Sequence, residues 1–162
     1  MAETERTRRG SLIQQIAVIF STGLYTGYSP IAPGTVGTIL AVPLYLALSR
    51  LSPVLYGITV LAFLWMACWM ASMAEPVFGK RDSGHIVIDE VAGFLVTMSF
   101  LPPTAGHVLL GFVLFRFFDI LKPFPIRRLE GLQGGYGVVA DDVMAGIYGN
   151  VAVRVCLFLW PF

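Results

Sequence analysis

The amino-acid sequence predicts an all-α integral membrane protein: a small bundle of about five helices, of which about four cross the bilayer. Of its 162 residues, 56% are hydrophobic and only 13% are charged, and the mean hydropathy is +0.76. A soluble domain of this length carries roughly twice that charged fraction. The apolar residues fall in runs separated by short polar or Gly/Pro-rich segments. This pattern is typical of successive membrane helices.

The first part of the chain is less apolar than the rest. Residues 1–10 are polar with three arginines and are expected to form a flexible tail, followed by one membrane-embedded domain over residues 11–162. Residues 13–28 mix Gln, Ser, Thr and Gly with apolar side chains. The first helix is therefore expected to be interfacial or re-entrant rather than spanning.

The remaining apolar runs predict the other helices. Residues 54–74 form the cleanest spanning candidate, with about the 20 residues that a bilayer requires. Further helices are expected at residues 36–49, 86–101, 107–121 and 138–160. Length alone fits a single domain.

The distribution of Lys and Arg predicts the orientation. With the N-terminus in the cytoplasm and the first helix turning back, the basic loops at residues 80–81 and 122–128 face the cytoplasm. The turns at residues 49–53 and 102–106 then lie outside, with one positive charge between them. Polar segments from separate parts of the chain converge at the cytoplasmic surface, where ionisable residues usually mark a functional site.

Acidic residues interrupt the apolar runs in two adjacent pairs, and two further carboxylates lie nearby. Magnesium takes oxygen ligands and is usually held by a few carboxylates together with phosphate and water. The acidic residues therefore predict a magnesium site. They are Asp82, Asp89, Glu90, Asp119, Asp141 and Asp142.

Helix capping is the alternative explanation, because an acidic residue at a helix start meets free backbone N–H groups and the positive end of the dipole. Capping is credible for Asp141 or Asp142, which follow soon after Gly137. It explains Asp89 and Glu90 less well, since they lie within an apolar run.

A group of cations follows in "FRFFDILKPFPIRRLE". Arg116, Asp119 and Lys122 are spaced i, i+3, i+6 and share one helix face, and the helix is expected to end at Lys122, before a proline. These residues with Arg127 favour a phosphate clamp, because Arg offers bidentate contacts and Lys a point charge. An internal salt-bridge ladder, or contacts of Arg127 and Arg128 with anionic lipid headgroups, are the alternatives.

Two Gly-rich segments, "SPIAPGT" and "GGYG", offer backbone N–H groups to a phosphate. Thr35, in the first of them, is a candidate phosphate-binding residue. Gly and Pro are also ordinary turn residues, so each segment taken alone is weak support for a site.

Four segments together carry a family resemblance: "TGYSPIAPGTVGT", "DSGHIVIDEVAGF", "GFVLFRFFDILKPFPIRRLE" and "GGYGVVADDVMAG". They resemble the phosphatidylglycerophosphatase A family over nearly the whole chain from about residue 16. The resemblance implies a multi-pass protein of the bacterial inner membrane with one phosphatase domain. It implies magnesium-dependent removal of the terminal phosphate of phosphatidylglycerophosphate, a membrane phospholipid, to give phosphatidylglycerol.

The resemblance carries over these acidic residues together with Arg116, Lys122 and Arg127, and the needs of phosphoryl transfer suggest their roles. The catalytic candidates are Asp89, Glu90, Asp119 and Asp142. The phosphate-binding candidates are Arg116, Lys122, Arg127 and Thr35. The metal-ligand candidates are Asp82, Asp89, Glu90, Asp141 and Asp142. The attacking group, a water or a carboxylate, is left open, with water favoured because no aspartyl-phosphate signature is present.

The main alternative function is transport or binding of a phosphorylated substrate. A small transporter or binding protein for an anionic phosphorylated substrate would place its ionisable residues near the membrane midplane, whereas most lie at one edge here. A net charge of +1 does not suggest nucleic-acid binding. The partners expected are the lipid substrate and the bilayer, and the oligomeric state is left open.

Overall fold

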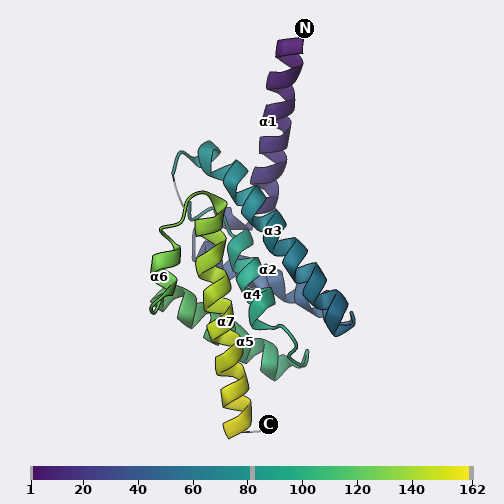
Figure 1. Ribbon diagram of the computed structural model, residues 1–162, viewed down its shortest axis with the longest axis vertical. Coiled ribbons are helices and arrows are strands. Elements are labelled where there is room, and N and C mark those ends of the chain that lie inside the picture. The colour runs from purple at the N-terminus through teal and green to yellow at the C-terminus, as the bar shows by residue number, and fades with distance from the viewer. Residues whose placement is uncertain (1, 81–82, 161–162) are drawn as a thin grey trace.

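The structure is a computed structural model that describes residues 2–80 and 83–160, with side chains from Leu12 onward. This described part is all-helical and contains no strand, which confirms the predicted class (Figure 1). A 3₁₀ turn, η1 (Thr26–Tyr28), joins the first two helices. The α-helices are α1 (Ala2–Ser21), α2 (Pro33–Leu48), α3 (Pro53–Phe78), α4 (Ile88–Thr97), α5 (Ala105–Leu121), α6 (Ile126–Leu129) and α7 (Gly135–Leu159).

The number of helices was predicted wrongly, because these described residues form seven helices and not about five. The difference comes from short elements. The four-residue α6 lies in the basic loop that was expected to be irregular, and it begins after Pro125. The predicted flexible tail, residues 1–10, falls where side chains lie outside the description, and it stays a prediction.

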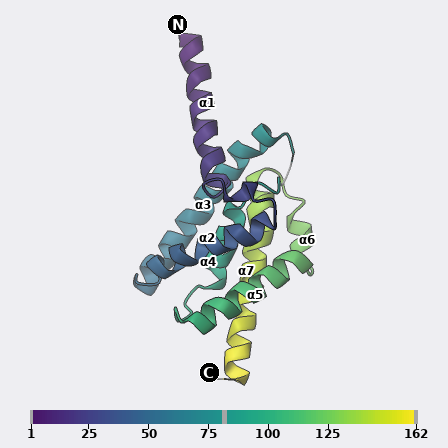
Figure 2. The same ribbon diagram turned by 180° about the vertical axis from the view of Figure 1, so that it is seen from behind.

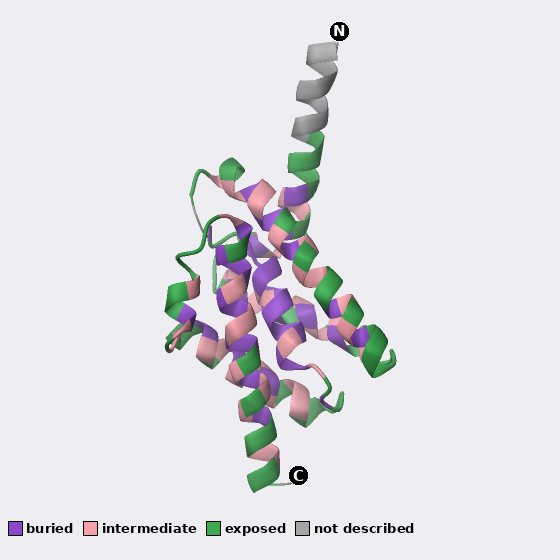
Figure 3. Cartoon of the chain, in the orientation of Figure 1, coloured by how far each residue is buried: buried purple, intermediate pink, exposed green. Residues whose placement is uncertain are grey.

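Two of the described helices, not about four, are long and apolar enough to cross a membrane. α3 has 26 residues and α7 has 25, and only 28% of the most apolar 18-residue window of each is buried. Val54, Leu61 and Trp65 on α3 are all more than two-thirds exposed. The outer faces of these helices are therefore apolar surfaces that no other described part of the chain covers (Figure 3).

α4 is much shorter than the apolar run from which a spanning helix was predicted. It starts only at Ile88, directly after Val87, whose backbone N–H donates to the carbonyl of Ser21 at the end of α1 (2.8 Å). It ends at Thr97. Ten residues rise about 15 Å, half of a hydrocarbon core of about 30 Å.

α4 forms the centre of the bundle. Phe94, Leu95 and Met98 are fully buried, and α7 packs along one side of α4 (Figures 1 and 3). Glycines permit this close approach: a Cβ at Gly93 would lie 2.6 Å from the backbone oxygen of Asp142, and one at Gly146 would collide with the carbonyl of Gly93. The two helices therefore touch through their backbones.

The packing brings separate helix ends together. The first turn of α4, the second turn of α7 and the C-terminal half of α5 meet, and α2 begins beside them (Figure 2). The connections from α2 to α3 and from α4 to α5 lie at the other end of the bundle (Figure 1). The predicted polar residues are thus collected at one end.

Candidate functional site

Three carboxylates lie together where α4 meets α7. Asp89 and Glu90 come from the first turn of α4, and Asp142 comes from the second turn of α7. One oxygen of each lies within 4.8 Å of the others. Asp89 and Asp142 are only 6% and 3% exposed. Their convergence is the arrangement predicted for a cation with oxygen ligands.

The helix starts reverse the expectation about capping. α7 begins at Gly135 and has no acidic residue in its first turn, so capping does not explain Asp141 and Asp142. Asp89 and Glu90 do lie in the first turn of α4, where the helix dipole stabilises negative charge. The dipole at this helix start therefore helps to hold two carboxylates at the cluster.

Arg116 on α5 lies beside the cluster. Its Nη1 is 2.6 Å from Oδ2 of Asp119 and 3.7 Å from Oε1 of Glu90. The negative charge of Asp119 also acts on Asp142. Asp119 is 9% exposed, so this part of α5 adds both a carboxylate and its counter-ion to the buried site.

Gly34, at the start of α2, closes the other side of the cluster. A Cβ at this position would overlap Oε1 of Glu90 and lie 3.0 Å from Nη1 of Arg116. A side chain at this position would displace the Glu90 carboxylate. Thr35 is the next residue and is half-buried, and its N–H is one of the first-turn donors that make no bond within the helix.

Lys122 and Asp141 form an ion pair at the edge of the cluster. Nζ of Lys122 is 2.7 Å from Oδ2 of Asp141 and 3.6 Å from Oε1 of Glu130. As predicted, α5 ends just before Pro123: Leu121 is its last residue, and Lys122 caps it in a left-handed conformation (φ 45°, ψ 59°). Asp141, a predicted metal ligand, is thus paired with a predicted phosphate ligand and is not in the group of three carboxylates.

The other predicted site residues lie further out. Arg127 is exposed and, with Lys122 and Arg128, lines an open cavity of about 460 Å³ beside α6. The guanidinium of Arg128 lies 4.8 Å from the centre of the Phe124 ring. Asp82 lies outside the described residues, and its predicted role as a ligand stays a prediction.

The site carries more negative than positive charge. Five carboxylates (Asp89, Glu90, Asp119, Asp141 and Asp142) surround two cations, Arg116 and Lys122, which leaves an excess of three negative charges if all are ionised. Among the described residues, Oε2 of Glu90 and Oδ2 of Asp142 are buried and have no hydrogen-bond partner. Burial raises the pKa of the Glu90 carboxyl above its usual range. Buried acceptors without donors are costly, and a divalent cation would balance both the charge and the lone pairs.

Two contacts of the site escaped the sequence analysis. Glu130 reaches Lys122 from beyond α6, and no regular spacing relates the two across the helix break. Gly34 was expected either to offer a backbone N–H group to a phosphate or to form a turn, whereas in the structure its lack of a side chain leaves room for the Glu90 carboxylate. The "PGT" sequence at the start of an apolar run was the available signal for a close backbone approach.

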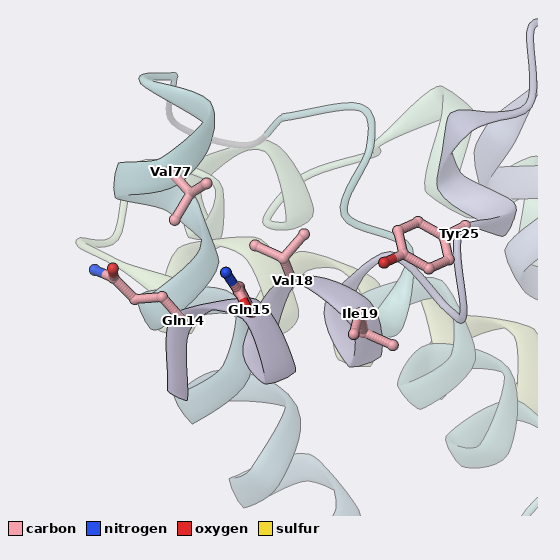
Figure 4. Close-up of a pocket in the computed structure, with 6 residues that line it drawn as sticks. All are labelled: Gln14, Gln15, Val18, Ile19, Tyr25 and Val77. Carbon is pink, nitrogen blue, oxygen red and sulfur yellow. The ribbon is translucent and has the colours of Figure 1, made fainter. Parts of the chain in front are cut away.

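A separate cavity of about 360 Å³ lies between α1 and α3 (Figure 4). α1 contributes two glutamines and two apolar side chains, and Tyr25 and Val77 complete the lining. It contains none of the predicted site residues. The predicted site residues that the structure describes therefore lie at the junction of α2, α4, α5 and α7 and in the adjoining basic loop.

Comparisons with known proteins agree with this geometry. A family model described as phosphatidylglycerophosphatase A matches residues 19–157. The phosphatidylglycerophosphatase A of Haemophilus influenzae is 39% identical over 160 residues, covering 94% of this chain and 95% of that protein. The protein of the same name in Escherichia coli is 32% identical over 148 residues, covering 88% of this chain and 84% of that protein.

A third relative has a different name. It is a putative phosphatidylinositol-3-phosphatase of Bacteroides thetaiotaomicron, 36% identical over 148 residues, covering 86% of this chain and 92% of that protein. No solved structure matches the chain. The family match spans the whole site from Thr35 to Asp142 and confirms the resemblance read from the four segments. This chain belongs to the phosphatidylglycerophosphatase A family, a family of phosphoric monoester hydrolases.

Proposed function

We propose that the protein hydrolyses phosphatidylglycerophosphate to phosphatidylglycerol and inorganic phosphate, in a magnesium-dependent reaction at the cytoplasmic surface of the bacterial inner membrane. The observation that carries this is the buried group of Asp89, Glu90 and Asp142 beside Arg116. Membrane location is supported by the exposed apolar faces of α3 and α7.

The residues present fit a magnesium ion. All the available ligand atoms are carboxylate oxygens, within 4.8 Å of one another, and magnesium prefers oxygen donors. Asp89, Glu90 and Asp142 would hold the ion. When bound, it would supply positive charge against the phosphoryl oxygens.

The side chains of this chain would position the phosphate. Phosphoryl transfer depends mostly on charge neutralisation and in-line positioning. Arg116 would contact the phosphoryl oxygens while Asp119, 2.6 Å away, fixes the guanidinium. Lys122 would add a second cation from the end of α5, released in part from Asp141 by the incoming negative charge.

The reaction consumes one water. Its oxygen forms the new bond to phosphorus, and the bond from phosphorus to the lipid glycerol oxygen breaks. A cluster carboxylate oxygen would accept the proton of the attacking water, and the glycerol oxygen takes up a proton as it leaves. The surrounding helices exclude bulk water from Asp142, which is 3% exposed, and this strengthens every charge interaction there.

The substrate is tested directly with purified protein in detergent. Phosphate release is measured from phosphatidylglycerophosphate and from phosphatidylinositol 3-phosphate, with magnesium, after EDTA treatment, and after magnesium is restored. We expect turnover of phosphatidylglycerophosphate that is lost with EDTA and regained with magnesium. An Asp142→Asn preparation controls for contaminating phosphatases. Faster release from the inositol lipid would change the proposed substrate, and full turnover after chelation would exclude the metal.

A further inference from the structure

An apolar groove of about 630 Å³ lies between α2 and α5. These helices run side by side in opposite directions (Figure 2). The lining is apolar throughout: Ile39, Val42 and Leu46 come from α2, and Ala105, Val108 and Phe112 come from α5. Ile39 is 56% exposed, so the groove opens to the outside of the bundle.

The groove continues directly from the candidate site. On α5, Phe112 lies one turn before Arg116, and on α2, Ile39 lies one turn after Thr35, so each pair shares a helix face. The two helices approach each other at the site itself, where a Cβ on Gly34 would be 3.0 Å from Nη1 of Arg116. One end of the groove therefore lies beside the candidate site and Arg116, and the lining away from that end is apolar.

The length of the groove fits one hydrocarbon chain. From Arg116 back to Ala105 a helix rises about 16 Å. One leaflet of a hydrocarbon core of about 30 Å is about 15 Å deep. A lipid with its phosphate at Arg116 would thus have room for an acyl chain along the groove.

We propose that the α2–α5 groove binds an acyl chain of the lipid phosphomonoester whose phosphate lies at the candidate site. This inference rests on the proposed function and adds to it where the substrate's apolar part lies. The α1–α3 cavity of Figure 4 differs in having two glutamines and no charged side chain in its lining. It has no anchor for a phosphate.

The groove acts on orientation more than on affinity. An acyl chain leaves a bilayer that is as apolar as the leucine side chains it meets, so transfer into the groove yields little free energy. Fixing the chain does restrict how the headgroup can tilt, and small misplacements at a reacting centre reduce rates strongly. The groove should therefore favour long-chain over short-chain substrates in kcat/KM.

A groove-filling variant tests this. Val108→Trp places an indole in the groove, whereas Val113→Trp adds the same bulk at an exposed position of α5 that does not line it. We expect Val108→Trp to lower kcat/KM about tenfold for a long-chain phosphatidylglycerophosphate, and to leave a water-soluble dihexanoyl analogue unchanged. Turnover of the short-chain analogue also shows that the variant is folded. Equal rates of the two variants on the long-chain lipid, or equal losses of Val108→Trp on both substrates, would overturn the proposal.

Photo-crosslinking separates the substrate from bulk lipid without relying on turnover. Wild-type protein is illuminated with phosphatidylglycerophosphate or phosphatidylcholine, each carrying a diazirine at the end of one acyl chain. We expect crosslinks to α2 and α5 groove peptides with the phosphomonoester lipid, reduced by an unlabelled competitor, and no such enrichment with phosphatidylcholine. Equal labelling by both lipids would show a general bilayer-facing surface instead. If wild-type protein hydrolyses neither acyl form, the proposed function fails, whereas a failure of the groove alone leaves hydrolysis intact.

Discussion

The polar groups at the two ends of α4 differ in whether they have hydrogen-bond partners. At its N-terminal end, Asp89 and Glu90 face Asp142 and leave buried oxygens of Glu90 and Asp142 without donors among the described residues. At its C-terminal end, Nδ2 of Asn150 donates to the carbonyls of Thr97 (2.7 Å) and Ser99 (2.9 Å).

Arg154 completes the C-terminal arrangement. Its Nε donates to Oδ1 of Asn150 (2.8 Å), and its Nη2 donates to the carbonyl of Ser99 (3.1 Å). Donors and acceptors match here, as they do in polar clusters that stabilise a fold. α7 therefore supplies a structural polar group and a candidate catalytic one on the same helix. The unpartnered oxygens at the N-terminal end favour the acidic cluster, and not the Asn150 group, as the ligand site.

The largest expected effect is a loss of turnover when Asp142, in the acidic cluster at the start of α4, is replaced. Asp142→Asn keeps the shape of the side chain but removes a charge that the cation and phosphate require. We expect turnover to fall at least about 100-fold, while stability without magnesium is unchanged or higher, because like charges surround Asp142. Phosphate release and thermal unfolding in detergent measure the two effects. A folded Asp142→Asn protein with wild-type turnover would place the catalytic site elsewhere.

The second largest effect is expected for Lys122, at the edge of the acidic cluster. Lys122→Ala removes one of two cations and leaves Asp141, 3% exposed, without its partner at 2.7 Å. We expect about a tenfold loss of turnover, as for removal of a charge-assisted contact to phosphate, together with lower stability.

Glu130→Ala is the matched control for Lys122. Its side chain is 44% exposed and 3.6 Å from Lys122, and exposed ion pairs contribute little, so turnover should stay within about twofold. If Lys122→Ala and Glu130→Ala behave alike, Lys122 does not act on the phosphate.

At the C-terminal end of α4, a substitution should lower stability and leave turnover unchanged. Asn150→Ala removes two donors and leaves the carbonyls of Thr97 and Ser99 poorly satisfied. We expect a loss of about 1–3 kcal/mol in the free energy of unfolding, seen as a lower unfolding temperature. Turnover per folded molecule should be unchanged below that temperature. A large loss of turnover without a loss of stability would contradict the structural role of Asn150.

The smallest effect on the protein is expected from single cysteines that show which side of the membrane a loop faces. In a Cys68→Ala, Cys156→Ala background, Gln133→Cys and Lys80→Cys should resist an impermeant thiol reagent in intact cells. Arg50→Cys, in the turn at the other end of the bundle, should react. This follows from the bias of basic loops toward the cytoplasm. Ready labelling of Gln133→Cys from outside would invert the proposed topology.

Sequence patterns predicted the residues of the site better than their pairing. Both acidic pairs, Asp89–Glu90 and Asp141–Asp142, were expected at one metal site because charges in apolar runs are costly and usually functional. The structure brings Asp89, Glu90 and Asp142 within 4.8 Å of one another, without Asp141. The pairing of Lys122 with Asp141 was not predicted. It depends on how the break after α5 directs the chain into α7, which no local spacing encodes.

The length of α4 was misjudged for a similar reason. Its apolar run extends from residue 86 to residue 101, and composition alone suggests a spanning helix. The end at Thr97 depends on Asn150, more than fifty positions later, which takes up the carbonyl groups of Thr97 and Ser99. Helix class was readable from hydropathy, whereas helix ends depend on partners from distant parts of the chain.

The contact between Gly93 and Gly146 limits how far apart the helices that carry the carboxylates can lie. Because α4 and α7 meet through main-chain atoms, no side chain between them can repack to change the distance between the backbones that carry Asp89 and Asp142. A single methyl group at Gly93 would act as a wedge, widening the gap by displacing a whole helix. Such a variant could keep every acidic and basic residue and still be inactive. The glycines therefore determine the geometry of this site as much as the carboxylates do.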